Sequence, residues 1–125
     1  MQIIHHICEC LSDLHSGGYV HRDLKPGNVI WLPSQNRWTL IDFGCAAKQG
    51  EAARIGFSLP YAAPEVAKAC YRDQQLTMAA HPSLDMWSLG VIAIELFSGR
   101  PALKVFKSQE EVCACKFCLL SKQFR

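Results

Sequence analysis

Three short motifs hold the residues of this chain whose types suit chemistry on a phosphate group. They are HRDLKPGN at residues 21–28, DFG at residues 42–44 and APE at residues 63–65. Asn28 and Asp42 offer oxygen ligands, which Mg²⁺ prefers together with water and phosphate oxygens. Asp23 lies five residues before Asn28 and is a carboxylate able to accept a proton. This combination suits metal-assisted phosphoryl transfer, which depends mainly on positioning and on stabilising negative charge.

In this order, the motifs resemble the catalytic loop, the metal-binding triplet and the end of the activation segment of protein kinases. Each motif alone is a weak signal, because short strings occur by chance and most single aspartates are solvated surface residues. Three motifs in the family's order exclude chance. The chain is therefore identified as resembling a eukaryotic-type protein kinase of the serine/threonine class.

The resemblance assigns roles to particular residues. Asp23 would be the base that orients the acceptor hydroxyl, and Asn28 and Asp42 would hold Mg²⁺ against ATP. Lys25 is similar to the lysine that serine/threonine kinases place near the γ-phosphate, so it counts as both catalytic and ATP-binding. Ser58 occupies the position of a hydroxyl residue that contacts Asp23 and Lys25. The implied ligands are ATP, Mg²⁺ and a protein carrying a Ser or Thr acceptor.

Further residues resemble the family's supporting positions. His21 and Phe43 would stack in an apolar spine, and a buried Asp85 would cap the backbone of the catalytic loop. Ile92 and Leu96 would support the adenine site through Ile30, which is thereby a predicted ATP contact.

Arg22 commonly pairs with a phosphorylated residue in this family. Residues 45–55 contain no Ser, Thr or Tyr, so Glu51 is a candidate substitute anion for Arg22.

The composition limits which classes of protein and which partners fit this chain. The 125 residues are 50% apolar and 19% charged with a net charge of +2, which is typical of one globular domain. The scattered basic residues predict no nucleic-acid partner. No signal peptide is visible, and the apolar run at 86–97 is too short to span a bilayer, so we expect an intracellular, cytoplasmic protein without a membrane partner. The seven cysteines predict free thiols, and the cluster Cys113, Cys115 and Cys118 lacks a fourth zinc ligand.

The elements that must position these motifs can be predicted from spacing. Apolar residues at helical intervals followed by a Gly-Gly pair predict a helix over 2–16. Runs at 29–32 and 38–41 joined by a Pro-Ser-Gln-Asn turn predict a small β-hairpin. Residues 19–24 should be extended, 42–62 a long loop, and a short helix should follow Pro64. Residues 85–97 are apolar on nearly every side and predict a central core helix.

The fold class is thus mostly α with a small β-hairpin, a protein-kinase-like carboxyl-terminal lobe that is truncated. We place a partial kinase domain at residues 1–112 and leave 113–125 as an unassigned tail. No glycine-rich loop and no VAIK-like strand with its lysine occur in the sequence. A missing amino-terminal lobe, or a partner chain, is therefore expected to complete the nucleotide site.

Three functions stay open at this point. The parent activity would be ATP-dependent phosphorylation of protein Ser or Thr, with this chain inactive by itself. The alternatives are a non-catalytic lobe that docks substrates or competes with an intact kinase, and an incomplete product without separate function. The sequence does not identify the substrate, the kinase subfamily, the upstream regulator, the reason for the truncation or a role for the tail.

Overall fold

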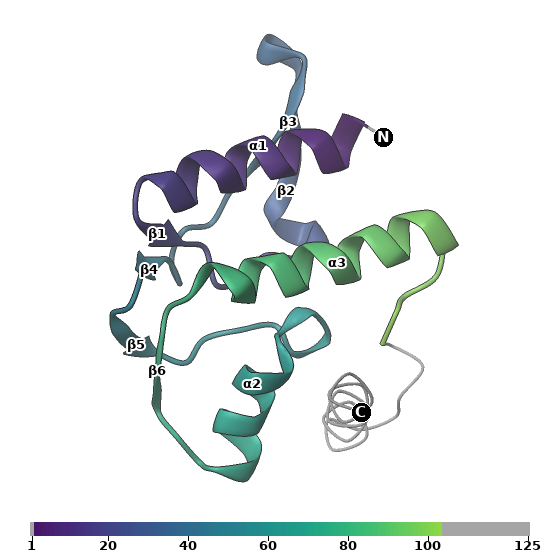
Figure 1. Ribbon diagram of the computed structural model, residues 1–125. Helices are drawn as coiled ribbons and strands as arrows, with labels where there is room; N and C mark the ends of the chain where they lie inside the picture. The colour runs from purple at the N-terminus through teal and green to yellow at the C-terminus, as the bar shows by residue number, and fades with distance from the viewer. Residues whose placement is uncertain (1, 104–125) are drawn as a thin grey trace, which may run out of the picture.

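The computed structural model describes residues 2–103. Its two longest helices have 15 and 17 residues, and short strands and loops surround them in Figure 1. The elements follow the chain in the order α1 (Gln2–Ser16), β1 (Tyr19–Val20), β2 (Val29–Leu32), β3 (Arg37–Leu40), β4 (Ala47–Lys48), β5 (Ala52–Arg54), α2 (Pro64–Ala67), β6 (Thr77–Ala79) and α3 (Pro82–Ser98). The predicted helix over 2–16, the hairpin and the short helix after Pro64 are confirmed.

Helix α1 forms because its apolar residues recur on one side. Ile7 and Leu11 are buried from this side, and the helix packs against β3 and α3. Gly18 follows the helix with φ of 83°, a left-handed conformation that glycine adopts without steric cost. The chain then reverses into β1, which leads directly to the first motif.

Strands β2 and β3 form the antiparallel hairpin, with Val29 opposite Leu40 and Trp31 opposite Trp38. A 3₁₀ turn at Pro33–Gln35 and the left-handed residue Asn36 connect them. The two tryptophan rings meet edge-on at a centroid distance of 5.5 Å. The hairpin joins the first motif to the second, since Asn28 precedes β2 and Asp42 follows β3.

The prediction of a long loop over 42–62 is wrong in part. Strand β4 pairs with β1, and β5 pairs with β6, so this segment is anchored at two points. The strands are only two and three residues long and rich in alanine, so they carry no alternating pattern. Their stability depends on partners distant in the sequence, which local patterns do not reveal. Within residues 2–103 the fold therefore has three two-stranded sheets instead of one hairpin.

Helix α3 crosses the middle of the molecule and supplies much of its core. Its first residue is Pro82, three residues before the predicted start, because His81 accepts a hydrogen bond from the Ser83 N–H at 3.2 Å and caps the helix. It ends at Ser98 and is followed by the capping residue Gly99, whose φ is 67°. The main buried cluster, shared by α1, α3 and the hairpin, contains Ile7, Leu11, Leu24, Val29, Leu40, Tyr61, Leu89, Val91 and Ile92.

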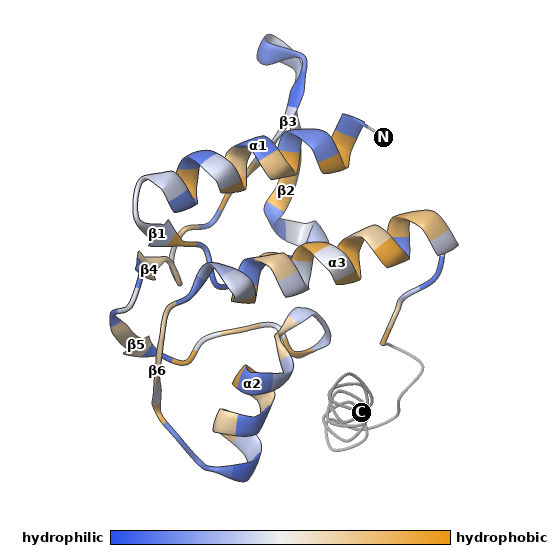
Figure 2. Cartoon of the chain, viewed as in Figure 1, coloured by the Kyte–Doolittle hydropathy of each residue, from blue (hydrophilic) through white to orange (hydrophobic). Residues whose placement is uncertain are grey.

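The opposite side of α3 is only partly covered by the described residues. Met86, Ile94 and Phe97 are 53%, 58% and 74% exposed, and Figure 2 shows apolar colour continuing along the helix to its carboxyl end. The predicted central helix is thus buried on one side, and its other side is largely exposed among residues 2–103. No helix in this range combines the length and apolarity that a membrane span requires.

Candidate active site

The first motif is held in place by the buried carboxylate of Asp85, near the start of α3. Its oxygens accept hydrogen bonds from the backbone N–H groups of His21 at 2.9 Å and Arg22 at 2.8 Å. The imidazole Nε2 of His15 contacts the same carboxylate at 2.8 Å. Arg22 has φ of 73°, an uncommon conformation for a side-chain-bearing residue that these contacts stabilise. The predicted capping role of Asp85 is confirmed, whereas the contribution of His15 was not predicted.

Asp23, Lys25 and Ser58 form a closed triangle of polar contacts. The Ser58 hydroxyl donates to Asp23 Oδ1 at 3.0 Å, and Lys25 Nζ donates to Ser58 Oγ at 2.9 Å. Lys25 Nζ also lies 3.6 Å from Asp23 Oδ2. A carboxylate and an ammonium group are thus fixed beside one another by a hydroxyl that is 35 residues away from Asp23 in the chain. The predicted contacts of Ser58 are confirmed.

Asn28 connects this triangle to the second motif. Its side chain is buried, and Nδ2 donates to the backbone oxygen of Asp23 at 2.8 Å and lies 3.5 Å from Asp23 Oδ2. The backbone oxygen of Asn28 accepts a hydrogen bond from the Ile41 N–H at 2.9 Å. This pairing continues the β2–β3 hairpin by one step and brings Asp42, the next residue, to the same end of the sheet as Asn28.

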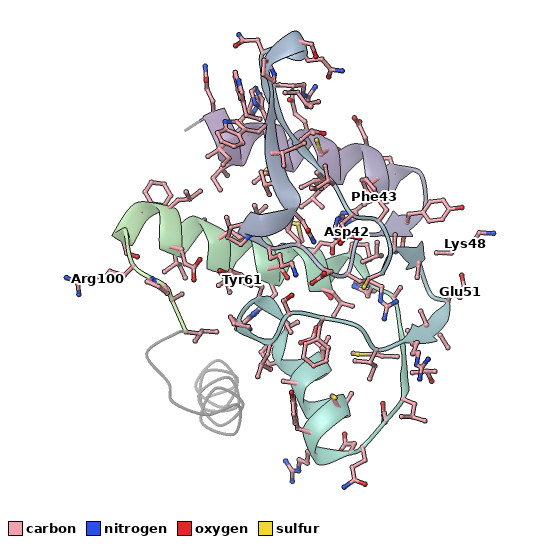
Figure 3. The ribbon with its side chains drawn as sticks, turned by 180° about the vertical axis from the view of Figure 1, so that it is seen from behind. Asp42, Phe43, Lys48, Glu51, Tyr61 and Arg100 are labelled. Carbon is pink, nitrogen blue, oxygen red and sulfur yellow. The ribbon has the colours of Figure 1, made fainter. Side chains whose placement is uncertain are left out.

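Asp42 and Phe43 lie side by side at the start of the following segment, as Figure 3 shows. Asp42 has φ of 59°, and its Oδ1 accepts from the Gly44 N–H at 3.3 Å. A Cβ at position 44 would lie 3.2 Å from that oxygen, a tight contact that the Asp42 side chain would have to relieve by shifting. The Phe43 ring meets the His21 ring edge-on at 5.2 Å, and His21 Nε2 contacts the Ile41 carbonyl at 3.0 Å. The predicted stack is confirmed.

Asn28 and Asp42 fit a hard cation such as Mg²⁺. Both recorded hydrogen bonds of the Asn28 amide use Nδ2, which directs the amide oxygen away from Asp23. The Asp42 carboxylate is exposed to solvent. No group of three or more His, Cys, Asp or Glu residues within 2–103 is arranged to hold a metal. This sparse oxygen set suits an ion that takes its remaining ligands from water and nucleotide phosphates.

The suggestion that Glu51 pairs with Arg22 is wrong. Arg22 donates from NH1 to the Cys45 carbonyl at 3.0 Å and from NH2 to the Arg54 carbonyl. Glu51 lies at the outer edge of the molecule beside Lys48 in Figure 3. The guanidinium therefore ties the first motif to both ends of the 45–54 segment through backbone oxygens, a function that sequence patterns do not disclose.

Ile92 and Leu96 of α3 were predicted to support Ile30, but the residue of β2 that packs near them is Val29. Val29 is buried in the cluster that contains Ile92, whereas Ile30 points from the other face of β2 and is exposed. Leu96 and Ile92 line a shared hollow with Val29. Adjacent residues in a strand face opposite sides, so only one of the pair can contact α3. Ile30 remains accessible to a ligand, and its predicted contact with ATP stays a prediction.

Tyr61 links the segment after Ser58 to α3 and was not predicted to have this function. Its hydroxyl donates to Glu95 Oε2 at 2.9 Å, and Glu95 Oε1 accepts from the Ala102 N–H at 2.9 Å. Burial, reinforced by the Glu95 carboxylate, raises the pKa of Tyr61 to about 12. The phenol therefore stays protonated as a donor near neutral pH. The available signal was a single glutamate among the apolar residues of the second half of α3.

Known proteins resemble this chain in sequence. Serine/threonine-protein kinase Kist from Homo sapiens is 38% identical over 112 residues, which cover 83% of this chain and 26% of Kist. SNF-related serine/threonine-protein kinase from Homo sapiens is 34% identical over 126 residues, covering 96% of this chain and 15% of that protein. Serine/threonine-protein kinase SBK2 from Mus musculus is 39% identical over 95 residues, covering 74% of this chain and 26% of SBK2.

The chain thus spans about a quarter or less of the length of these relatives. Residues 1–122 also match the protein kinase domain family as a whole, ten residues beyond the boundary predicted at 112. The tail at 113–125, with its three cysteines, lies outside the described residues. With the motifs in the family's order and their side chains assembled as described, the chain belongs to the protein kinase domain family.

Proposed function

We propose that this chain is the part of a serine/threonine protein kinase that binds Mg²⁺ and the acceptor hydroxyl. The parent reaction would transfer the γ-phosphoryl group of ATP to a Ser or Thr of a protein. The observation that carries this proposal is the Asp23–Ser58–Lys25 triangle, with distances of 3.0 and 2.9 Å at the Ser58 hydroxyl. It places a proton acceptor and a fixed cation side by side, which phosphoryl transfer to a hydroxyl requires.

In this mechanism Asp23 orients the acceptor hydroxyl and takes its proton. Lys25 stabilises negative charge on the transferred group, and Ser58 fixes the distance between the two side chains. Asn28 and Asp42 would hold Mg²⁺, which when bound neutralises phosphate charge. Asn28 also fixes the Asp23 backbone through its Nδ2 contact. Preference for Ser or Thr is supported by Lys25 and by the names of the relatives.

The proposal assigns half of the nucleotide site to an amino-terminal lobe. Such lobes supply a glycine-rich loop and a strand lysine to the phosphates, and neither occurs in residues 1–125. Deleting three charge-assisted contacts of roughly 1.5–3 kcal/mol each removes about 4–9 kcal/mol of binding free energy. That loss converts micromolar affinity into millimolar affinity.

We therefore expect the chain by itself to show no measurable kinase activity and only millimolar affinity for Mg-ATP. A lobe-completed protein, meaning this chain joined to the amino-terminal lobe of a relative kinase, should phosphorylate a generic Ser/Thr substrate. Calorimetry and a radiolabelled phosphate-transfer assay on both proteins measure these results. Micromolar Mg-ATP binding by the chain alone would contradict the assigned need for a second lobe. Substrate binding without transfer by the lobe-completed protein would favour the docking alternative.

Replacing Ser58 with Ala should weaken the triangle without removing either charge. Loss of two charge-assisted hydrogen bonds predicts a decrease in kcat/KM of the lobe-completed protein on the order of 10- to 100-fold. Ser58→Thr keeps the hydroxyl and should retain most activity. Ser58→Glu should not restore it, because its carboxylate repels Asp23. If phosphatase treatment silenced the enzyme and mass spectrometry located the phosphate on Ser58, the positioning role would be refuted.

A further inference from the structure

Arg22 holds residues 45–54 against the catalytic loop through neutral backbone groups. Its Nη1 donates to the Cys45 carbonyl at 3.0 Å, and its Nη2 donates to the Arg54 carbonyl. Both side-chain hydrogen bonds of Arg22 within residues 2–103 therefore go to backbone oxygens. Hydrogen bonds from a charged donor are stronger than those between neutral groups. A single side chain thus connects the catalytic loop to both ends of this segment.

Backbone pairing accounts for most of the same segment. Its strands β4 and β5 pair with β1 and β6, which come from other parts of the chain. Between β4 and β5, the Gln49 N–H donates to the Gly18 carbonyl at 2.8 Å. The Gly50 N–H donates to the Ala80 carbonyl at 2.7 Å. The segment therefore obtains its hydrogen-bond partners from the chain itself, and this pairing uses no added group.

The paired strands also bury a small apolar cluster. Val20 of β1 and Ala80 are 0% and 1% exposed, and Ala47 of β4 is 8% exposed. Ala53 of β5 is partly buried and packs against them. Burial of aliphatic side chains is favourable whether or not a charge is added nearby. The cluster therefore stabilises the segment independently of any phosphate.

Two observations disfavour a phosphate as the partner of Arg22. Residues 45–55 contain no Ser, Thr or Tyr, so the segment offers no hydroxyl for phosphorylation. A cavity lined in part by Arg22 and residues 55–57 has a volume of about 20 Å³, roughly the space that one water molecule needs. Where phosphorylation orders a kinase loop, it does so through new pairs between arginine and phosphate. Here two carbonyls bind the guanidinium instead.

We propose that Arg22 is a positioning residue that keeps residues 45–55 ordered for phosphoryl transfer without a phosphate on any residue of the chain. The segment leads on to Ser58, whose hydroxyl donates to Asp23 at 3.0 Å. Order in the segment is therefore passed to the group that fixes the proposed base. The inference rests on the proposed function and adds its regulation, because activity then depends on the second lobe and not on phosphorylation of this chain.

Amide hydrogen exchange in the full chain tests the role of Arg22. Arg22→Met fills similar space without donors, so exchange at residues 46–55 should accelerate by a factor on the order of ten or more. Arg22→Lys can still donate to one carbonyl and should restore part of the protection. The control Arg72→Met removes an exposed arginine outside the segment and should leave exchange at residues 46–55 unchanged. The amides of α1 report global unfolding and should keep their protection.

The exchange rates separate the possible outcomes. Equal rates at residues 46–55 in the unchanged chain and in Arg22→Met would overturn the proposal. If Arg22→Met also unfolded α1, the decision would rest on Arg22→Lys. Full protection of residues 46–55 in that variant would overturn the proposal, and partial protection would support it.

Phosphatase treatment of the lobe-completed protein tests the regulation. After removal of the phosphatase, its rate of substrate phosphorylation should equal the rate before treatment, and mass spectrometry should find no phosphate on the treated chain. Loss of activity on treatment, with a phosphate located in residues 1–125 beforehand, would overturn the proposal. Thr77 is the position to inspect first, because it is exposed and pairs with Arg54 across β5 and β6. A lobe-completed protein without transfer in either state would contradict the proposed function, while the exchange rates would still decide the role of Arg22.

Discussion

Asp23→Asn in the lobe-completed protein should lower kcat by a factor on the order of 10²–10⁴ and leave Mg-ATP affinity nearly unchanged. Asp23 contacts Ser58 and Lys25, on the side of the site that we propose receives the acceptor. The amide is close in size to the carboxylate but cannot accept the proton. Single-turnover kinetics measure the chemical step, and equilibrium titration with Mg-ATP measures binding.

Asp42→Asn is the matched comparison for this prediction. Asp42 follows the hairpin at the same end as Asn28, where a metal ion would bind, and its Oδ1 accepts a hydrogen bond from the Gly44 N–H. The substitution removes one negative charge from the proposed Mg²⁺ site, so it should weaken Mg-ATP binding as well as lower kcat. Equal loss of Mg-ATP affinity in both variants would contradict the separate roles proposed for the two aspartates.

Elements governed by local patterns could be predicted from the sequence. Helix α1 and the hairpin follow from the spacing of apolar residues and from turn residues within the same short stretch. Of these two elements, the hairpin matters most for the site, because its register brings Asn28 and Asp42 to the same end of the β2–β3 sheet. The contacts among Asp23, Lys25 and Ser58 were predicted only from the resemblance to kinases, because Ser58 lies too far along the chain for a local pattern to indicate them.

Contacts between distant backbone groups could not be predicted in the same way. Strands β4 and β5 lack a pattern of their own and form because β1 and β6 offer free hydrogen-bonding edges. Arg22 binds the carbonyls of Cys45 and Arg54, and every residue type carries a carbonyl, so side-chain identity gives no signal. The prediction chose Ile30 where Val29 packs near α3. In a strand only one of two adjacent apolar residues faces the core, and the sequence alone did not show which one.

Asp85→Ala should have the largest effect on stability. This side chain is 1% exposed and accepts hydrogen bonds from two backbone N–H groups of the catalytic loop while contacting His15. Removing it leaves those buried donors unpaired, and breaking such a buried charged network costs about 3–5 kcal/mol. Because total stabilities are roughly 5–15 kcal/mol, the variant should lose about a fifth or more of its free energy of unfolding.

Urea unfolding of the lobe-completed protein, followed by circular dichroism, measures the change in the free energy of unfolding. Asp85→Asn keeps one accepting oxygen and should be intermediate, while Glu51→Ala alters an exposed carboxylate and serves as the control. His15→Ala should destabilise less than Asp85→Ala, because both backbone hydrogen bonds to Asp85 survive. If Asp85→Ala unfolded at the same urea concentration as Glu51→Ala, the carboxylate would not be what holds the catalytic loop. The left-handed backbone of Arg22, at φ of 73°, would then need another source of stabilisation.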